Sequence, residues 1–300
     1  MQELQWVLLM HPISTIKYIA QSAYAFWNPE YCKDDEFGRC SICGNYGRFK
    51  HGLVVRPESE IAVSCGWDKQ FTEEINITNT LKCRYCASKF RVRCAAESML
   101  KYFWKGKIIS VAELLNGISE GRIDANWHAL ETTANDGIFT GLRSVNNVVR
   151  SEYFDNIERG RCKDGVRSED LQDLTFSDNA FDVVIALDVF EHISDPLKAF
   201  AEVRRALKPS GVGIITVPLD RRIIKTKTIA KMDSGKIVYL DKQAYHSDPL
   251  RKEGAPVFTE FGMDMVDNLS SLGYNASWDI YKTRRTGVEQ RVILLKKVTV

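Results

Sequence analysis

The stretch FDVVIALDVFEHISDPLKAFAEVRRALKPSGVGIITVP, residues 181–218, decides the fold class of this chain. It begins with an apolar run, breaks into acids and a histidine, continues at helical spacing and ends in a second apolar run. A strand, a crossover helix and another strand predict two parallel strands covered by a helix. Ligands of such sheets bind beyond the carboxyl ends of the strands, so the polar residues after the first run mark a candidate site.

Short apolar strands and amphipathic helices alternate from residue 127 to the end of the chain. The pattern predicts an α/β fold with a doubly wound, seven-stranded, mostly parallel, Rossmann-like sheet whose last two strands form a closing pair. The expected helices lie at 137–145, 195–208 and 258–273, and the expected strands at 127–133, 147–154, 165–171, 181–189, 211–218, 274–281 and 288–298.

The composition is typical of a folded, soluble protein. The chain has 300 residues, of which 44% are hydrophobic, enough to bury a full core. Its 41 basic and 39 acidic side chains give a net charge of +2, so no overall field favours nucleic acid or a membrane surface. The apolar run at residues 6–10 is too short for a signal segment or a membrane span. We expect a cytoplasmic protein without membrane insertion, and no pattern specifies an oligomeric state.

Four of the eight cysteines form two C-x2-C pairs separated by 39 residues: Cys40 with Cys43, and Cys83 with Cys86. Each pair directs two sulfurs at one point, and Gly44 lets the backbone curl toward the first pair. The pattern predicts a structural zinc ion held by four thiolates. A redox site would need only one such pair, whereas an iron–sulfur cluster would use the same four ligands.

The other four cysteines show no such spacing. Each is expected to be a small buried apolar residue rather than a ligand or a nucleophile. They are Cys32, Cys65, Cys94 and Cys162.

Basic and aromatic residues alternate around the second cysteine pair. Such a surface can hold phosphates and stack bases, which would suit RNA. The competing interpretation is a solvated face beside the metal. The residues are Lys82, Arg84, Lys89, Arg91 and Arg93, with Tyr85 and Phe90.

The chain divides into four expected segments. A helix is expected in residues 1–30, followed by a zinc-ribbon-like module at 31–95 and bridging helices at 96–126. Residues 127–300 would form the sheet domain. Ser110 is the expected N-cap of the second bridging helix, with Glu113 at capping-box spacing.

Acidic residues follow three successive strands of the expected sheet. Glu131 ends the first strand, Glu152 ends the second 21 residues later, and Asp170 follows the third. A carboxylate about 20 residues after the first turn is where a ribose diol is bound in sheets of this type. The spacing therefore favours a nucleoside cofactor.

Residues 169–218 resemble the class I S-adenosylmethionine-dependent methyltransferases of the type 11 group. The shared features occur in order: a polar-acid turn, L-x-F-x-D-x-x-F-D, an apolar strand, E-H, a helix, L-K-P-x-G and a final strand. The segments VRSEYF, VRSEDL and YHSDP extend the resemblance to residues 40–298, toward a subgroup with a cysteine module in front. The resemblance implies S-adenosylmethionine as the cofactor.

The resemblance also implies roles for single residues. Glu152 would bind the cofactor ribose, and Asp170 with the Leu171 backbone would bind the adenine. Asp188, at the end of the fourth strand, would lie beside the methionine portion of the cofactor.

The first turn departs from the family pattern of acid-x-Gly-x-Gly-x-Gly. Here it reads ETTANDG, so Glu131 supplies the acid, Thr133 and Asn135 replace two glycines, and Gly137 is retained. A Cβ at those positions restricts the approach of the backbone to a cofactor, although Asn tolerates left-handed φ better than most residues. The two substitutions could therefore weaken cofactor binding or abolish catalysis.

Methyl transfer is an in-line displacement in which the protein positions an acceptor and excludes water. A hydroxyl acceptor also needs a base. The candidates are His192, which could instead bond to backbone at a helix start, and His246, with Tyr245 as a second polar group. Residues 219–258 form a long insertion that is expected to act as a lid. Its first part, residues 220–236, has six basic side chains that could hold a phosphorylated or carboxylated acceptor: Arg221, Arg222, Lys225, Lys227, Lys231 and Lys236. A solvated surface is the competing interpretation of these bases.

Three functions fit the sequence. The first is methyl transfer to a small molecule, namely a sugar, a sugar nucleotide or a glycan end; deoxysugar C-methyltransferases also carry a cysteine module before the same sheet. The second is an RNA base methyltransferase that grips its substrate with the zinc module. The third is a cofactor-free binding scaffold, in which the altered glycine turn no longer holds the cofactor.

Overall fold

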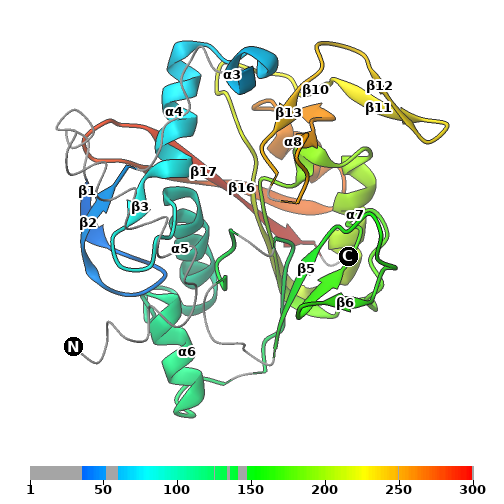
Figure 1. Ribbon diagram of the computed structural model, residues 1–300. Coiled ribbons are helices and arrows are strands. Elements are labelled where there is room, and N and C mark those ends of the chain that lie inside the picture. The colour runs from blue at the N-terminus through cyan, green and yellow to red at the C-terminus, as the bar shows by residue number, and fades with distance from the viewer. Residues whose placement is uncertain are drawn as a thin grey trace.

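A computed structural model describes residues 36–51, 60–124, 126–133, 136–140, 147–248 and 250–298. An eight-stranded sheet forms its centre, in the order β16-β17-β9-β8-β4-β5-β7-β6 (Figure 1). The strands are β4 (Ala129–Glu131), β5 (Val148–Glu152), β6 (Cys162–Lys163), β7 (Val166–Ser168), β8 (Phe181–Leu187), β9 (Leu207–Thr216), β16 (Tyr274–Lys282) and β17 (Glu289–Lys297).

The five central strands β7, β5, β4, β8 and β9 are parallel. β17 runs antiparallel to β9, and β16 runs antiparallel to β17, which is the expected closing pair. The chain leaves β4 toward β5 on one side and returns to β8 on its other side, so the strand order reverses at β4. This is the place where doubly wound sheets bind ligands. The fold class is confirmed, and the additional strand is β6, a two-residue edge strand antiparallel to β7.

Buried side chains alternate between the two faces of the sheet. On β8, Val183 and Ile185 face one core, and Val184 and Ala186 face the other. Successive side chains of a strand point to opposite faces, so a strand covered on both sides is apolar throughout. This explains the uninterrupted apolar run that opens the stretch 181–218.

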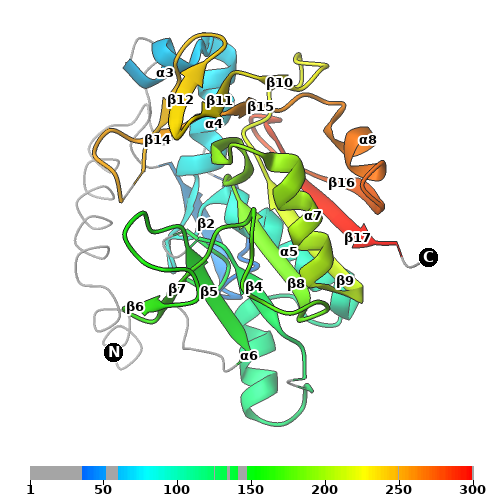
Figure 2. The same cartoon turned by 90° about the vertical axis from the view of Figure 1, so that its right-hand side faces the viewer.

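Helices cover both faces of the sheet (Figures 1 and 2). Met99 of α5 and Leu114 of α6 pack into one core, and Phe200 of α7 and Met265 of α8 pack into the other. The helices are α5 (Phe90–Trp104), α6 (Val111–Ser119), α7 (Pro196–Ala206) and α8 (Met265–Ser270).

Helix starts follow the expected capping chemistry. The Ser110 hydroxyl accepts the Glu113 N–H at 3.1 Å, and the Glu113 carboxylate accepts the Ile109 N–H at 2.9 Å. At α7, Asp195 accepts the Lys198 N–H at 3.0 Å. Side-chain acceptors satisfy amides that have no partner inside the helix.

Two of the expected helices differ from the structure. Residues 137–140 form turns instead of the start of a helix, because the amides of Ile138 and Phe139 are directed at the Glu131 carboxylate. The expected helix at 258–273 begins only at α8, because its first residues pair as strand β15 (Thr259–Glu260) with β10 (Lys227–Thr228).

The cysteine pairs lie at the turns of a small antiparallel sheet, and helix α5 lies between this sheet and the large one (Figure 1). The order of the small sheet is β1-β2-β3, and Cys40 and Cys83 share a hydrophobic core with Val183 and Val212 of the large sheet. Residues 1–30, where a helix was expected, lie outside the described residues. The elements are β1 (Glu36–Arg39), β2 (Tyr46–Lys50), β3 (Lys82–Cys83), α3 (Glu60–Cys65) and α4 (Lys69–Thr80).

The insertion at 219–258 forms short paired strands beside α3 and α4 (Figure 2). Arg222 pairs with Asp68 at the start of α4, and the Lys242 ammonium donates to the Val63 carbonyl of α3. Among the described residues, no helix is both long and apolar enough to cross a membrane. The further strands are β11 (Ala230–Asp233), β12 (Lys236–Tyr239), β13 (Tyr245–His246) and β14 (Ala255–Pro256).

Candidate functional site

The four predicted metal ligands meet at one point. The sulfurs of Cys40 and Cys86 are 3.7 Å apart, and those of Cys43 and Cys83 are 3.8 Å apart. Sulfurs bound about 2.3 Å from one tetrahedral ion lie about 3.8 Å apart. Hydrogen bonds from the other three thiols, Cys43 first, hold the pKa of Cys40 well below its usual range. The cluster therefore fits a tetrahedral metal ion held by thiolates.

The two cysteine turns have the same backbone. Gly44 has a φ of +76° and donates its N–H to the Cys40 carbonyl at 2.8 Å. Ala87 has a φ of +59° and donates to the Cys83 carbonyl at 2.9 Å. Gly44 has the conformational freedom that a tight turn needs, and its amide bonds to a carbonyl instead of a thiolate. Ala87 takes the same left-handed conformation, which costs an L-residue more than glycine.

The remaining cysteines differ in their surroundings. Cys94 is buried in the core as expected, whereas Cys162 is exposed on the edge strand β6, which the prediction had wrong. Cys65 is partly buried, and its thiol donates to the Tyr245 carbonyl at 3.5 Å. Cys32 lies outside the described residues.

Several bases near the second cysteine pair point inward. Arg93 is buried, stacks at 4.0 Å on the ring of Phe49, and donates to the Ser88 carbonyl at 2.6 Å. Lys89 pairs with Asp136 at 2.6 Å. Arg93 and Lys89 therefore bind groups of the protein itself. The interpretation of a solvated basic face applies only to the other bases of this segment.

Acidic side chains follow four adjacent parallel strands at their carboxyl ends. Glu131 ends β4 and Glu152 ends β5, Asp170 follows β7 and Asp188 follows β8. The carboxyl ends of parallel strands meet at one edge of a sheet, so the structure brings these predicted residues together.

Glu131 holds the altered glycine turn against the sheet. Its carboxylate is fully buried and accepts the N–H groups of Ile138 at 2.5 Å and Phe139 at 3.3 Å. A Cβ on Gly137 would lie 2.2 Å from the carboxyl carbon of Glu131. A side chain at position 137 would therefore collide with the Glu131 carboxylate. Thr133 lies partly buried before this turn, and Asn135 lies outside the described residues.

The next two acids lie at strand ends as expected. Glu152 is partly exposed and accepts the Tyr153 N–H at 3.1 Å. Asp170 accepts the Gln172 N–H at 2.8 Å, which closes the turn, while the Leu171 side chain is buried.

Asp188 is bound to a side chain from the cysteine module. Arg91, at the start of α5, pairs with Asp188 and also with Asp136 of the glycine turn, at 2.5 Å for the latter. Thr216 donates to the other oxygen of Asp188 at 2.8 Å. Burial alone would lower the pKa of Arg91, but Asp188, Asp136 and Glu191 outweigh burial and raise it. One buried guanidinium therefore links α5 to the ends of β4 and β8.

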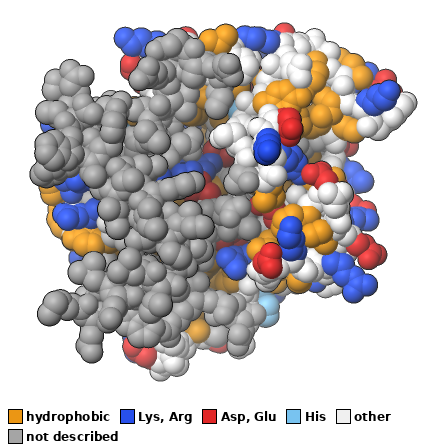
Figure 3. Space-filling view, viewed as in Figure 1, with side chains coloured by type: hydrophobic (Ala, Val, Ile, Leu, Met, Phe, Trp, Pro, Cys, Tyr) orange, Lys and Arg blue, Asp and Glu red, His pale blue; other side chains and the backbone are white. Residues whose placement is uncertain are grey.

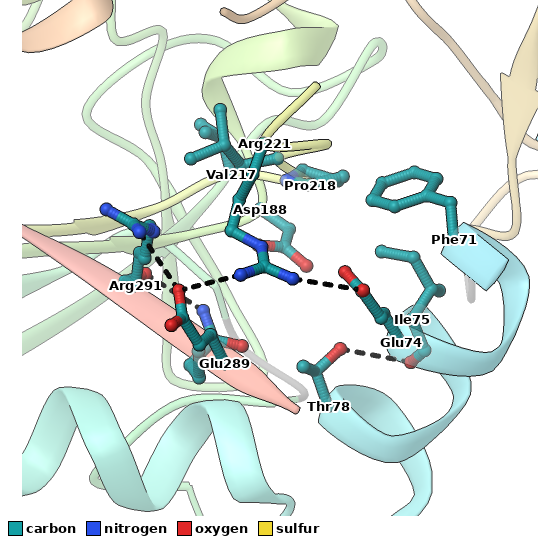
Figure 4. A pocket seen from close by; sticks show the side chains of 12 residues that line it. Phe71, Glu74, Ile75, Thr78, Asp188, Val217, Pro218, Arg221, Glu289 and Arg291 are labelled. Carbon is teal, nitrogen blue, oxygen red and sulfur yellow. Dashed lines mark hydrogen bonds and ion pairs between the residues drawn. The ribbon is translucent and has the colours of Figure 1, made fainter. Parts of the chain in front are cut away.

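A pocket opens beside Asp188, between α4, the residues after β9 and the start of β17 (Figure 4). Arg221 lies across it, 3.3 Å from both Glu74 and Glu289. Within the insertion, Arg222 pairs with Asp220 at 2.5 Å. These two arginines, offered above as anchors for an anionic acceptor, are neutralised by carboxylates.

The candidate bases His192 and His246 lie together. Their ring centroids are 4.9 Å apart, and both rings face the buried carboxylate of Glu191. Burial lowers the pKa of His192. Burial also opposes a charge on His246, but Cys65 and Glu191 outweigh it and raise the pKa of His246 to about 9. The Tyr245 hydroxyl instead accepts hydrogen bonds from Tyr239 at 2.8 Å and from the side chain of Gln243 at 2.9 Å.

A family model described as a methyltransferase domain matches residues 136–215, from the glycine turn to the end of β9. Residues 136–215 are a methyltransferase domain. The segment includes Glu152, Asp170 and Asp188, whereas the four cysteines precede it.

Curated relatives match this chain over short segments. Over 49 residues it is 45% identical to the glycine/sarcosine/dimethylglycine N-methyltransferase of Actinopolyspora halophila, covering 16% of this chain and 9% of that protein. Over 90 residues it is 32% identical to an uncharacterized protein of Methanocaldococcus jannaschii, covering 30% and 40% of the two chains. The chain thus spans less than half the length of either relative.

Solved structures of methyltransferases are also similar to this chain. The 1,6-didemethyltoxoflavin N1-methyltransferase of Burkholderia thailandensis, solved with S-adenosylhomocysteine, is 12% identical, with a TM-score of 0.33 over 84% of this chain and 96% of that one. A methyltransferase of Methanosarcina mazei is 15% identical, with a TM-score of 0.36 over 61% and 98%.

Two residues at the edge of the methyltransferase domain were not found from the sequence. Arg91 was grouped with the bases of the cysteine module, and nothing local indicates that it meets Asp188, 97 residues away. Glu191 could have been found from the sequence, because it directly precedes the candidate base His192 in the E-H motif.

The buried Glu131 gives the methyltransferase domain a pH dependence. Burial raises the pKa of Glu131 to about 7, so between pH 4.5 and 7 the folded protein keeps a proton that the unfolded chain loses, and stability falls as pH rises. A Glu131→Gln side chain can still accept the loop amides without this penalty. We compare the free energy of unfolding of the variant with that of wild type. This difference should shift in favour of the variant by about 2 to 3 kcal/mol as the pH rises from 5 to 8.

Urea unfolding at the two pH values measures this change. Glu253→Gln is the control, because Glu253 is exposed. A Glu131→Gln difference that does not vary with pH would show that Glu131 ionises normally.

Proposed function

We propose that this protein transfers a methyl group from S-adenosylmethionine to a small-molecule acceptor: a sugar, a sugar nucleotide or a glycan end. The observation that carries the proposal is the row of carboxylates at the ends of four adjacent parallel strands, three of them inside the methyltransferase domain. A charged row at a topological switch point suits a polyhydroxylated, cationic cofactor.

The glycine turn fits a bound nucleoside despite its two substitutions. Glu131 closes it by accepting two backbone N–H groups, and Gly137 leaves no room for a Cβ. In this proposal Glu152 accepts hydrogen bonds from the ribose hydroxyls. Asp170 and the backbone of Leu171 bind the adenine.

S-adenosylmethionine supplies an electrophilic methyl group, and the protein has to position the acceptor and exclude water. The insertion and α4 lie over the same edge of the sheet as Asp188, and Arg222 and Asp68 join them. His246 and His192 are the groups near this edge that can take or hold the proton of a hydroxyl acceptor. A small acceptor fits such a covered site better than a long chain does.

We also propose that the four cysteines hold a structural zinc ion. The closed set of four thiolates leaves no position for a substrate, which is typical of structural zinc. The support is the spacing of the sulfurs, 3.7 and 3.8 Å across the two closest pairs.

The RNA alternative is less well supported. Arg91, Arg93 and Lys89 are engaged with carboxylates or backbone, so three of the five bases of the module do not form an exposed grip. Basic and acidic side chains are intermixed on the described part of one face (Figure 3). RNA binding that weakens steeply with salt would favour this alternative.

Calorimetry with S-adenosylmethionine tests the proposal. Glu152→Ala should weaken binding about 10- to 100-fold, since a hydrogen bond to a charged group contributes about 1.5 to 3 kcal/mol. Glu158→Ala is the matched control, because Glu158 lies six residues further on and its side chain is 79% exposed. No heat and no thermal shift at millimolar cofactor would refute the enzyme and leave the binding scaffold.

A further inference from the structure

Three side chains of metal-binding type converge beyond the end of β8. Glu191 and His192 lie on the short helix η2 (Phe190–His192), and His246 lies on β13 in the insertion. Nε2 of His192 is 3.5 Å and Nδ1 of His246 is 3.6 Å from the same oxygen, Oε1 of Glu191. The three side chains are grouped closely enough to share one ion.

These separations are too long for hydrogen bonds but suit a common ligand. Ring nitrogens and carboxylate oxygens that form hydrogen bonds lie about 2.7 to 3.2 Å apart. Ligand atoms about 2.1 Å from one tetrahedral ion lie about 3.4 Å from each other. The observed 3.5 and 3.6 Å are therefore close to the spacing of atoms that surround a cation.

The carboxylate of Glu191 is buried without the partners that such a group needs. Its side chain is 3% exposed, and neither oxygen has a hydrogen-bond partner among the described residues. Burying a charged carboxylate without hydrogen bonds costs folding free energy unless a cation lies beside it. No Lys or Arg forms an ion pair with Glu191 in the described part of the chain, and the two histidines lie at 3.5 and 3.6 Å from one of its oxygens.

The tautomer of His192 strengthens this argument. Nδ1 of His192 lies 2.8 Å from the Pro256 carbonyl, which can only accept, so Nδ1 carries the proton. In the neutral ring, Nε2 then directs a lone pair at Oε1 of Glu191, which is repulsive unless a cation lies between them. Histidines that bind metals usually donate their other N–H to a carbonyl or a carboxylate. The Pro256 carbonyl supplies this bond.

One side of the group remains accessible. The side chains of His192 and His246 are 20% and 17% exposed, so the site is not closed by protein. Trp67 packs on His246 with ring centroids 5.6 Å apart, and the Phe258 N–H donates to the Glu191 carbonyl at 2.7 Å, which fixes two of the ligands in place. Three protein ligands leave at least one position open, as in catalytic rather than structural zinc sites.

We propose that Glu191, His192 and His246 bind a divalent metal ion of the zinc type, separate from the four-thiolate site. Two imidazoles and one carboxylate suit zinc, iron(II) or cobalt(II) better than magnesium or calcium. The open position takes an oxygen of the acceptor.

The role of the ion rests on the proposed methyl transfer, although its binding does not. With the ion bound, the two histidines would hold the metal instead of acting as the base. A hydroxyl on the ion would lose its proton to water, because a divalent ion makes bound oxygen more acidic. The oxygen lone pair then forms the new bond to the methyl carbon. The bond between that carbon and the sulfonium breaks, and its electron pair stays on sulfur as S-adenosylhomocysteine leaves.

Metal analysis of the full-length protein tests the site. After loading with zinc and removal of excess, wild type should hold two equivalents and His246→Ala one, and Glu191→Gln should bind the second ion at least tenfold more weakly. His128→Ala is the control, because His128 is half-exposed and remote from the cluster, and it should keep both ions. Loading with cobalt(II) instead of zinc shows which of the two ions a variant has lost. Only cobalt bound to thiolates gives sulfur-to-metal charge-transfer absorption. This absorption should persist in both His246→Ala and Glu191→Gln.

The outcomes separate this site from the proposed enzyme. One equivalent in wild type, or two in His246→Ala, would overturn the metal site and leave an ion pair between Glu191 and a protonated His246. Calorimetry of the same proteins with S-adenosylmethionine should give unchanged cofactor affinity in His246→Ala. A protein that holds two metal ions but binds no cofactor would refute the methyltransferase while the metal site stands.

Discussion

Cys40→Ser is expected to lose its thiolate-bound zinc and to unfold the cysteine module together with much of the protein. Structural zinc contributes about 10 to 16 kcal/mol in small peptides, which equals or exceeds the about 5 to 15 kcal/mol that stabilises a whole domain. Cys40 and Cys83 belong to the same hydrophobic core as Val183 and Val212 of the large sheet. The loss should therefore spread beyond the module.

Thermal melting and metal analysis measure this effect. We expect one cooperative transition at a much lower temperature, because the module and the sheet share a core and have no separate packing to lose. Cys162→Ser is the matched control, since Cys162 is an exposed thiol far from the cluster in sequence. A Cys40→Ser protein with unchanged melting and full thiolate-bound metal would contradict the zinc assignment.

Arg91→Ala is expected to destabilise the protein by about 3 to 5 kcal/mol, the usual cost of removing one partner of a buried ion pair. Arg91 has a side chain only 8% exposed and pairs with both Asp188 and Asp136. Without the guanidinium, Asp188 loses its ion-pair partner, and among the described residues Asp136 keeps an ion pair with Lys89.

Urea unfolding measures this loss. Arg84→Ala is the control, because Arg84 belongs to the same basic segment but is exposed. The double variant Arg91→Ala with Asp188→Asn should recover part of the stability, since it also removes the unpaired charge. A loss below about 1 kcal/mol in Arg91→Ala would show that the pair is effectively solvated.

Cofactor binding should depend on the same guanidinium. Arg91 comes from α5 and reaches the ends of β4 and β8, where the proposed cofactor would lie. The cysteine module thereby contributes a charged group to the edge of the methyltransferase domain. The module and the sheet are therefore joined by this ion pair as well as by their shared hydrophobic core.

Much of the fold could be predicted from the sequence because its signals are local. The apolar run 181–187 identifies a strand buried on both faces, and Ser110 and Asp195 identify helix starts by bonds within three residues. The two C-x2-C turns form their sulfur pairs through short-range backbone bonds at Gly44 and Ala87. Each feature depends on neighbours in the chain.

The carboxylate row was predictable for a related reason. The acids lie at strand ends, and parallel strands align their carboxyl ends whatever their exact bounds. Errors arose where segments distant in sequence compete for the same residues. The helix expected from residue 258 starts later, because Thr259 in β15 pairs with Thr228 of β10.

The sequence by itself thus determined the class of sheet, the four cysteines that cluster and the sheet edge that carries the acidic side chains, because periodicity and spacing act over a few residues. Only the tertiary structure decided which charges meet. Arg91 reaches Asp188 and His246 reaches Glu191 across 97 and 55 residues of chain, respectively. Such contacts depend on the packing of whole elements around a common core, and no local pattern encodes that packing.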